Sequence, residues 1–176
     1  MSASPFQGLP IARRSLAPGQ VLFARAAPVV AVHRVVDGLV ELVRHGADGS
    51  VLVLQRAGPG ALLAEASLFS ATYHCDAVAR RESIVESVRV ADLKARFGDA
   101  AFAEAWMARL SHEVQATRLR AEILSLRTVA ERLSAWLDVN GPPPAETRWV
   151  DVAAEIAVSP EALYRELARR RQAGRG

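Results

Sequence analysis

The chain has 176 residues, of which 51% are hydrophobic and 23% are charged, and its formal net charge is +3. This composition supplies enough apolar side chains for one or two folded domains and excludes a chain that is disordered throughout. A single cysteine, Cys75, excludes an internal disulfide and a four-cysteine zinc or iron–sulfur site within one chain.

The sequence contains no run of 18 or more uncharged apolar residues, and its first residues lack the basic-then-apolar order of a secretory signal. We therefore expect a cytoplasmic protein without a membrane partner. Residues 161–176 carry five arginines and two glutamates, a surplus of three that equals the net charge of the chain. This end is expected to face a polyanion, and a frayed arginine-rich tail is the alternative.

The first half of the chain is predicted to form short β-strands separated by glycine-containing turns. Two runs rich in β-branched residues, 39–44 and 51–56, are too short and too closely bounded by glycine to be helices. Asp48-Gly49 between them is typical of a tight primed turn, because glycine readily adopts the positive φ that such turns need. We expect the two runs to pair as an antiparallel hairpin within a jelly-roll-like β-roll.

Residues 100–126 change to apolar spacings that alternate between three and four. A helix with such a heptad seam packs either on a second copy of itself or on its own β-domain, and periodicity alone leaves both open. The seam consists of Met107, Leu110, Val114, Thr117, Ala121 and Leu124.

Three further helices are expected. The first covers residues 127–139 and ends at Asn140-Gly141, a C-cap signal that three prolines follow. The other two cover residues 149–157 and 160–171. Ser159 is a good N-cap for the last helix, and Pro160 suits its first position. The spacing is that of a helix-turn-helix, whose second helix presents side chains to the major groove, and a hairpin that serves only packing is the alternative.

The segment from Gly60 to Phe69, with residues 73–79, resembles the phosphate-binding cassette of the Crp/Fnr superfamily of bacterial transcription regulators. That cassette reads Gly-Glu-Leu-Gly-Leu-Phe, then Arg-Ser-Ala after a spacer of five, where this chain has Ala-Glu-Ala-Ser-Leu-Phe at 64–69 and Cys-Asp-Ala at 75–77. The family's recognition helix, Ser-Arg-Glu-Thr-Val-Gly-Arg, is similar to Ser-Pro-Glu-Ala-Leu-Tyr-Arg at 159–165. The resemblance covers nearly the whole chain.

The resemblance implies an α+β fold with three parts. An antiparallel, cyclic-nucleotide-binding-like β-roll sensor domain would span residues 1–98, a dimerisation helix 99–126, and a helix-turn-helix DNA-binding domain 127–176. Relatives continue into a β-hairpin wing, and we expect most of it to be missing, since the given sequence ends at Gly174-Arg175-Gly176.

The cassette has lost the groups that would bind a cyclic phosphate. Glu65 keeps the carboxylate that binds a ribose hydroxyl in relatives, but Cys75 and Asp76 replace arginine and serine, so a phosphate would meet a carboxylate instead of a guanidinium. We therefore expect an effector that is not a cyclic nucleotide. The candidate effector-pocket residues are Glu65, Ser67, Tyr73, His74, Cys75, Asp76, Thr117 and Arg118.

Two roles are open for Cys75: it is either a buried structural thiol or a redox-reactive thiol. Neighbours in a strand point to opposite faces, so His74 and Cys75 are not expected to pair with each other or to ligate one haem iron. We expect no haem, no other cofactor and no metal site. Since no catalytic motif is present, we expect no enzyme activity and no catalytic residues.

By the resemblance, Glu161 would accept a hydrogen bond from a cytosine amino group and Arg165 would donate two to guanine. The candidate DNA-binding residues are Ser159, Glu161, Ala162, Arg165, Arg169 and Arg170.

The expected function is therefore that of a homodimeric transcription regulator that binds a pseudo-palindromic DNA site and responds to an unknown small effector, with RNA polymerase as a further candidate partner. The alternative is a dimeric ligand- or redox-binding module that acts through a protein partner without specific DNA binding.

Overall fold

The computed structural model describes residues 4–143 and 148–173. The contacts divide the chain into two compact units, Met1–Glu104 and Ala105–Gly176, called the N-terminal and C-terminal units below. The division falls within the long helix, whereas the sequence places boundaries at 98/99 and 126/127. The expected end of the chain without a wing, Gly174 to Gly176, lies outside the described residues.

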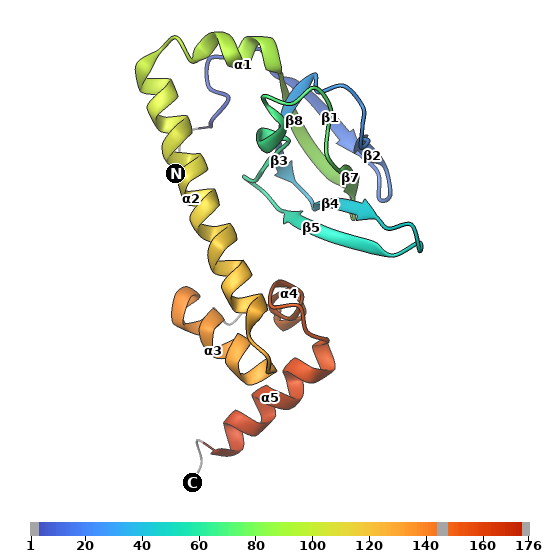
Figure 1. Ribbon diagram of the computed structural model, residues 1–176, viewed down its shortest axis with the longest axis vertical. Helices are drawn as coiled ribbons and strands as arrows, with labels where there is room; N and C mark the ends of the chain where they lie inside the picture. The colour runs from blue at the N-terminus through green and yellow to red at the C-terminus, as the bar shows by residue number, and fades with distance from the viewer. Residues whose placement is uncertain (1–3, 144–147, 174–176) are drawn as a thin grey trace. The chain divides into compact units, whose positions relative to one another are not determined.

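The N-terminal unit contains two antiparallel sheets of four strands each (Figure 1). In one sheet the order is β1 (Ala12–Leu16), β8 (Ser83–Arg89), β3 (Ala31–Asp37) and β6 (Leu62–Leu63). In the other it is β2 (Val21–Phe23), β7 (Asp76–Ala79), β4 (Val40–His45) and β5 (Val51–Ala57). The predicted β-roll is confirmed.

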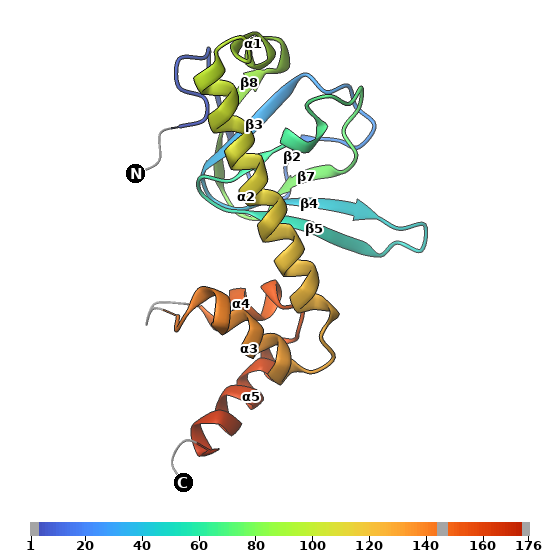
Figure 2. The ribbon, with the colours of Figure 1, turned by 60° about the vertical axis from the view of Figure 1, so that its left-hand side comes forward.

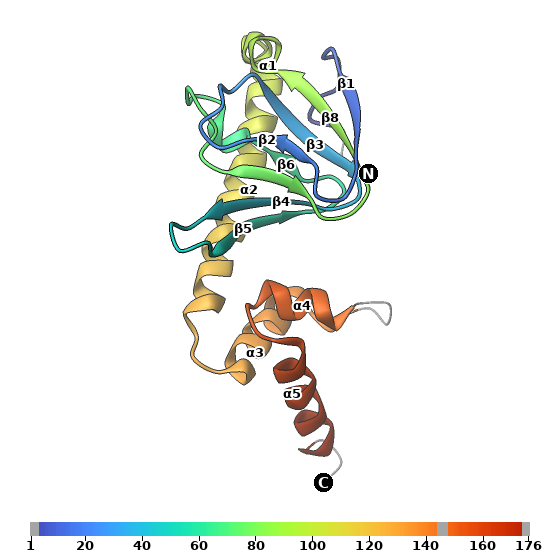
Figure 3. The ribbon, with the colours of Figure 1, turned by 90° about the vertical axis from the view of Figure 1, so that its right-hand side faces the viewer.

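The predicted hairpin is also confirmed, since β4 and β5 pair antiparallel from Val40↔Ala57 to His45↔Val51 (Figure 3). Its connection is longer than a two-residue turn and covers residues 46–50. Gly49 has the expected positive φ of 80°. The Asp48 side chain closes the loop by accepting hydrogen bonds from the Ser50 backbone N–H and hydroxyl.

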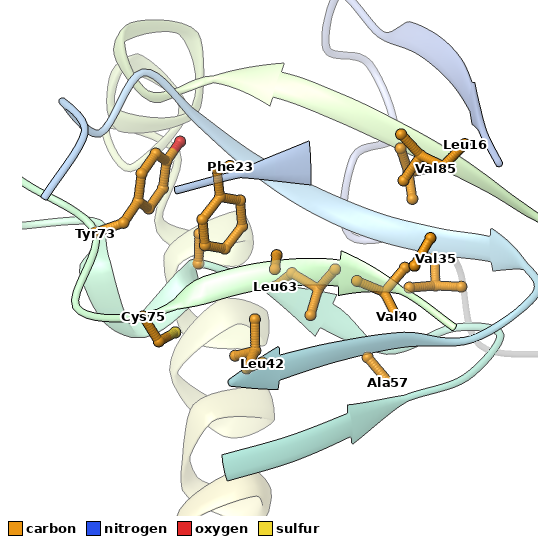
Figure 4. Packing of buried hydrophobic residues seen from close by; sticks show 13 residues of the cluster. Leu16, Phe23, Val35, Val40, Leu42, Ala57, Leu63, Tyr73, Cys75 and Val85 are labelled. Carbon is orange, nitrogen blue, oxygen red and sulfur yellow. The ribbon is translucent and has the colours of Figure 1, made fainter. Parts of the chain in front are cut away.

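The two sheets enclose a core of mainly aliphatic side chains (Figure 4). Alternation along the strands supplies it, because every second residue of a strand points to the same face. The fully buried members include Val35, Val40, Leu63 and Val85, and Cys75 lies among them.

Two helices follow β8, namely α1 (Val90–Arg96) and α2 (Ala100–Ser125). The predicted heptad helix thus forms as one continuous element. Its seam is not buried along its length: Met107 is 61% and Val114 48% exposed.

The C-terminal unit gathers α3 (Val129–Asn140), α4 (Trp149–Glu155) and α5 (Pro160–Ala173) around the C-terminal end of α2 (Figure 2). Thr128 caps α3 in a capping box with Glu131, and Gly141 ends it with a positive φ of 72°. The core of this unit consists of Ile123, Leu133, Trp136, Val152, Ala153, Ile156 and Leu163.

Candidate functional site

The cassette follows β6 and begins with a residue in an unusual conformation. Ala64 has φ 68° and ψ 8°, in the left-handed region that a glycine adopts without a steric penalty. A short 3-10 helix, η1 (Glu65–Ser67), starts directly after it, with Glu65 half-buried in its first turn. The backbone therefore keeps a glycine-like turn although the side chain is alanine.

Tyr73 and Cys75 point into the core of the β-roll (Figure 4). The Tyr73 ring stacks on Phe23 at 4.1 Å between centroids, and its hydroxyl donates a hydrogen bond to the Ala31 carbonyl at 3.0 Å. Burial raises the pKa of the Cys75 thiol. A buried thiol with a raised pKa forms little of the thiolate that redox chemistry needs, so the geometry favours the structural reading of Cys75.

His74 and Asp76 point away from that core. The Ser67 hydroxyl lies 3.1 Å from Nδ1 of the exposed His74. Asp76 accepts a hydrogen bond from the Arg25 backbone N–H at 2.7 Å and pairs with Nδ1 of His45 at 3.2 Å. The Asp76 carboxylate is therefore on the face opposite to Cys75, and we withdraw the expectation that it would repel a phosphate beside Cys75. The expectation that a cyclic phosphate does not bind therefore rests on the absence of an arginine guanidinium at position 75.

Phe69 ends the cassette as an exposed aromatic. Its ring is 80% exposed, and the Lys94 ammonium on α1 lies 4.8 Å from the ring centroid, a cation–π distance. The two other candidate pocket residues, Thr117 and Arg118, are exposed on α2 in the C-terminal unit.

The turn between α4 and α5 is built from two local motifs. The Val158 and Ala157 N–H groups donate to the Ala153 and Ala154 carbonyls, which is the Schellman pattern of a helix end. Ser159 then caps α5, because its hydroxyl accepts a hydrogen bond from the Ala162 N–H at 3.2 Å. Pro160 is the first residue of α5, as predicted.

Glu161 and Arg165 are exposed one helical turn apart on α5, and Ala162 between them is half-buried. Hydrogen bonds from its own backbone N–H and from Ser159, with a smaller contribution from Arg165, lower the pKa of Glu161. Glu161 is thus a charged acceptor at neutral pH, one turn from the exposed donor fork of Arg165.

Arg169 and Arg170 both pair with Glu166, which is buried. Arg169 forms a bidentate pair with it at 2.8 Å, and the hydrogen bonds from the two arginines lower the pKa of Glu166 to about 2. Arg170 also donates to the Ala130 carbonyl at 2.7 Å and to the Ser134 hydroxyl at 2.8 Å. Because these bonds tie α5 to α3, we now expect Arg170 to hold the helices together, and Arg169, whose side chain is 66% exposed, to remain available to phosphate.

Comparison with known proteins gives one domain match and several similar structures. Residues 13–98 match the cyclic nucleotide-binding domain. FixK2 from Bradyrhizobium japonicum has the same fold with a TM-score of 0.73, at 20% identity over 94% of this chain and 87% of that chain. TTHB099, a transcriptional regulator of the CRP family from Thermus thermophilus, gives 0.61 at 19% identity over 92% and 85%. The chain thus has the fold of these structures.

A third similar structure is that of CLP, a c-di-GMP-responsive global regulator from Xanthomonas campestris. It has a TM-score of 0.61 and 21% identity over 93% of this chain and 88% of that chain. No curated protein matches the sequence significantly. At these identities the structures establish the fold of the chain.

Among the described residues, no group of three or more histidine, cysteine, aspartate or glutamate side chains is placed to hold a metal ion. Within the same ranges, no helix is long and apolar enough to cross a membrane.

Two residues whose positions matter in the structure are not among those that the sequence indicates. Arg132 on α3 donates to the carbonyls of Leu124 and Leu126 at the end of α2, and to those of Ile156 and Ala157 at the end of α4. No local motif marks it, because its partners lie 6 and 8 residues before it and 24 and 25 residues after it. The second residue is Tyr164, which is exposed on α5. Because residues three apart in a helix share a face, its spacing from Glu161 could have predicted this exposure.

Proposed function

We propose that this protein is a homodimeric transcription regulator of the bacterial cytoplasm, which binds a pseudo-palindromic DNA site through α5. The observation that carries the proposal is the exposure of Glu161 and Arg165 on the outer face of α5, while Leu163 on its inner face is fully buried. Such a helix presents an acceptor and a bidentate donor in a fixed relation, as reading of cytosine and guanine edges requires. The likeness in fold to the CRP-family regulator TTHB099 supports it.

The turn before α5 supports the same proposal. The Schellman end of α4 and the Ser159 cap fix the N-terminus of α5, and Arg170 fixes its C-terminal half against α3. A recognition helix needs this support, because discrimination between bases is lost when the reading side chains move freely. Arg169 would then contact a phosphate and contribute salt-dependent affinity without sequence information.

We further propose that the effector is not a cyclic nucleotide. The position of the family's anion-binding arginine is held by Cys75, whose side chain is 1% exposed in the core. Adding cyclic AMP or cyclic GMP at millimolar concentration should leave the melting temperature unchanged, since a ligand that does not bind the folded state cannot stabilise it. A concentration-dependent rise in melting temperature with either nucleotide would contradict this.

The DNA proposal is tested by selecting bound duplexes from a random pool at near-physiological salt. Wild-type protein should enrich an inverted repeat. Arg165→Ala should bind this repeat about ten- to hundredfold more weakly and should lose the preference at one base pair per half-site. Arg14→Ala, which removes the same charge from β1 in the other unit, serves as the matched control and should enrich the same repeat.

A second comparison separates the roles of two neighbouring arginines. Arg169→Ala should reduce the slope of log affinity against log salt by about one per protomer, whereas Arg170→Ala should chiefly lower the stability of the C-terminal unit. If no variant yields an enriched repeat under any condition, the DNA proposal is wrong. The result would then favour the alternative, a module that acts through a protein partner.

A further inference from the structure

The exposed face of α5 carries an aromatic residue between the two proposed base-reading residues. The exposed positions of this face follow one another at intervals that alternate between three residues and one, as expected for one face of a helix. Tyr164 is 47% exposed, unlike its neighbour Leu163, which is fully buried in the core of the C-terminal unit. The exposed face consists of Glu161, Tyr164, Arg165, Ala168, Arg169 and Gln172.

Tyr164 has no part in the packing that holds α5. It is not a member of the core cluster, and among the described residues its hydroxyl makes no hydrogen bond, whereas Tyr73 in the β-roll is bonded to backbone groups. Side chains on a helix lean toward its N-terminus, so we expect the ring of Tyr164 to lie over the turn that carries Glu161. If α5 enters the major groove as proposed, the ring would then face the base edges.

The three side chains differ in the chemistry that they offer. Glu161 is an acceptor, Arg165 is a donor, and the ring of Tyr164 is an apolar surface. Among the groups that the four bases present in the major groove, the apolar one is the 5-methyl group of thymine. An apolar ring next to a guanine-reading arginine thus complements a thymine beside that guanine.

We propose that Tyr164 is a specificity-determining residue whose ring contacts the 5-methyl group of a thymine adjacent to the guanine bound by Arg165. The inference rests on the proposed function, since it assumes that α5 enters the major groove. The contact is made by the ring and not by the hydroxyl. This separates it from a hydrogen bond to phosphate, which would carry no sequence information.

The experiment uses the full chain and the inverted repeat enriched by the wild-type protein. Each thymine of a half-site is replaced in turn by deoxyuridine, which removes only the methyl group, and affinities are measured for wild type, Tyr164→Phe and Tyr164→Ala. One thymine per half-site should become sensitive: its replacement should weaken wild type and Tyr164→Phe by about three- to fivefold, as expected for the loss of one buried methyl group. Tyr164→Ala should bind the two duplexes equally. Circular dichroism and the melting temperature check that substitution of the half-exposed Tyr164 leaves the fold intact.

Four other outcomes are decisive. If the repeat is enriched but no thymine is sensitive, or if Tyr164→Ala remains as sensitive as wild type, the inference is wrong while the proposed function stands. If Tyr164→Phe loses affinity as strongly as Tyr164→Ala on every duplex, the hydroxyl binds phosphate, and the ring is not a base reader. If no repeat is enriched at all, the proposed function fails and the inference fails with it.

Discussion

Ala157, at the end of α4, stores strain that a single substitution should release. Its φ of 51° lies in the left-handed region, which costs a residue with a Cβ about 1 to 2 kcal/mol. It occupies the position of the Schellman motif where glycine is preferred. Ala157→Gly should therefore raise the free energy of unfolding by about 1 kcal/mol, measured by urea denaturation. Ala154→Gly, inside α4, is the matched control and should lower it by a similar amount, because glycine is a poor helix former. Equal losses from both would contradict the assignment.

His33 makes the stability of the β-roll depend on pH. Its Nδ1 lies 2.7 Å from the Ser87 hydroxyl, and burial, with a smaller contribution from Arg14, lowers its pKa from 6.5 to about 4. The unfolded chain takes up a proton near pH 6.5 and the folded chain only near pH 4. The contribution of His33 is thus complete above pH 6.5 and is lost as the pH falls from 6.5 to 4, by about 2 kcal/mol between pH 7 and 5.

Urea denaturation at pH 7, 6 and 5 measures this loss. The variant His33→Phe keeps an aromatic ring beside Phe23 but has no proton to gain. Its free energy of unfolding should fall less between pH 7 and 5 than that of wild type. An identical pH dependence in both proteins would show that other groups are responsible.

At the scale of elements, Arg132 joins two helix ends that no other described side chain connects by hydrogen bonds. Its guanidinium donates to four carbonyls, two at the end of α2 and two at the end of α4. Arg132→Ala leaves these carbonyls without a charged donor and should lower the free energy of unfolding by about 2 to 3 kcal/mol, with a parallel loss of affinity for the selected duplex. Arg132→Lys should recover only part of both, since an ammonium has no planar fork. Unchanged stability in Arg132→Ala would show that water replaces the guanidinium.

The elements could be predicted where their signals are local. Asp48-Gly49, the Ser159 cap and Asn140-Gly141 each mark a boundary through the conformations that a few consecutive residues favour. Contacts between distant segments carry no such signal. The side to which Asp76 points depends on Arg25 and His45, and the role of Arg170 depends on Ala130 and Ser134, so sequence spacing could not assign them.

At the scale of the whole molecule, the exposed seam of α2 predicts self-association. Met107 and Val114 are large apolar residues on a helix whose heptad pattern continues for more than three turns, and burying them against a second copy would remove them from water. Sedimentation velocity at micromolar concentration should show a dimer for the wild type. Val114→Glu, which places a charge in the seam, should shift it toward the monomer. His112→Glu, on an exposed position outside the seam, is the matched control and should leave the dimer intact, and a wild-type monomer would contradict the prediction.

The contact between Lys94 and Phe69 has a practical consequence, because Lys94 is the only lysine in the sequence. Among the side chains of the sequence, an amine-reactive dye therefore has a single lysine to label. A fluorophore on Lys94 would lie beside the exposed ring that ends the cassette. Its emission would report a movement of the cassette loop, so libraries of small molecules can be screened optically for an effector.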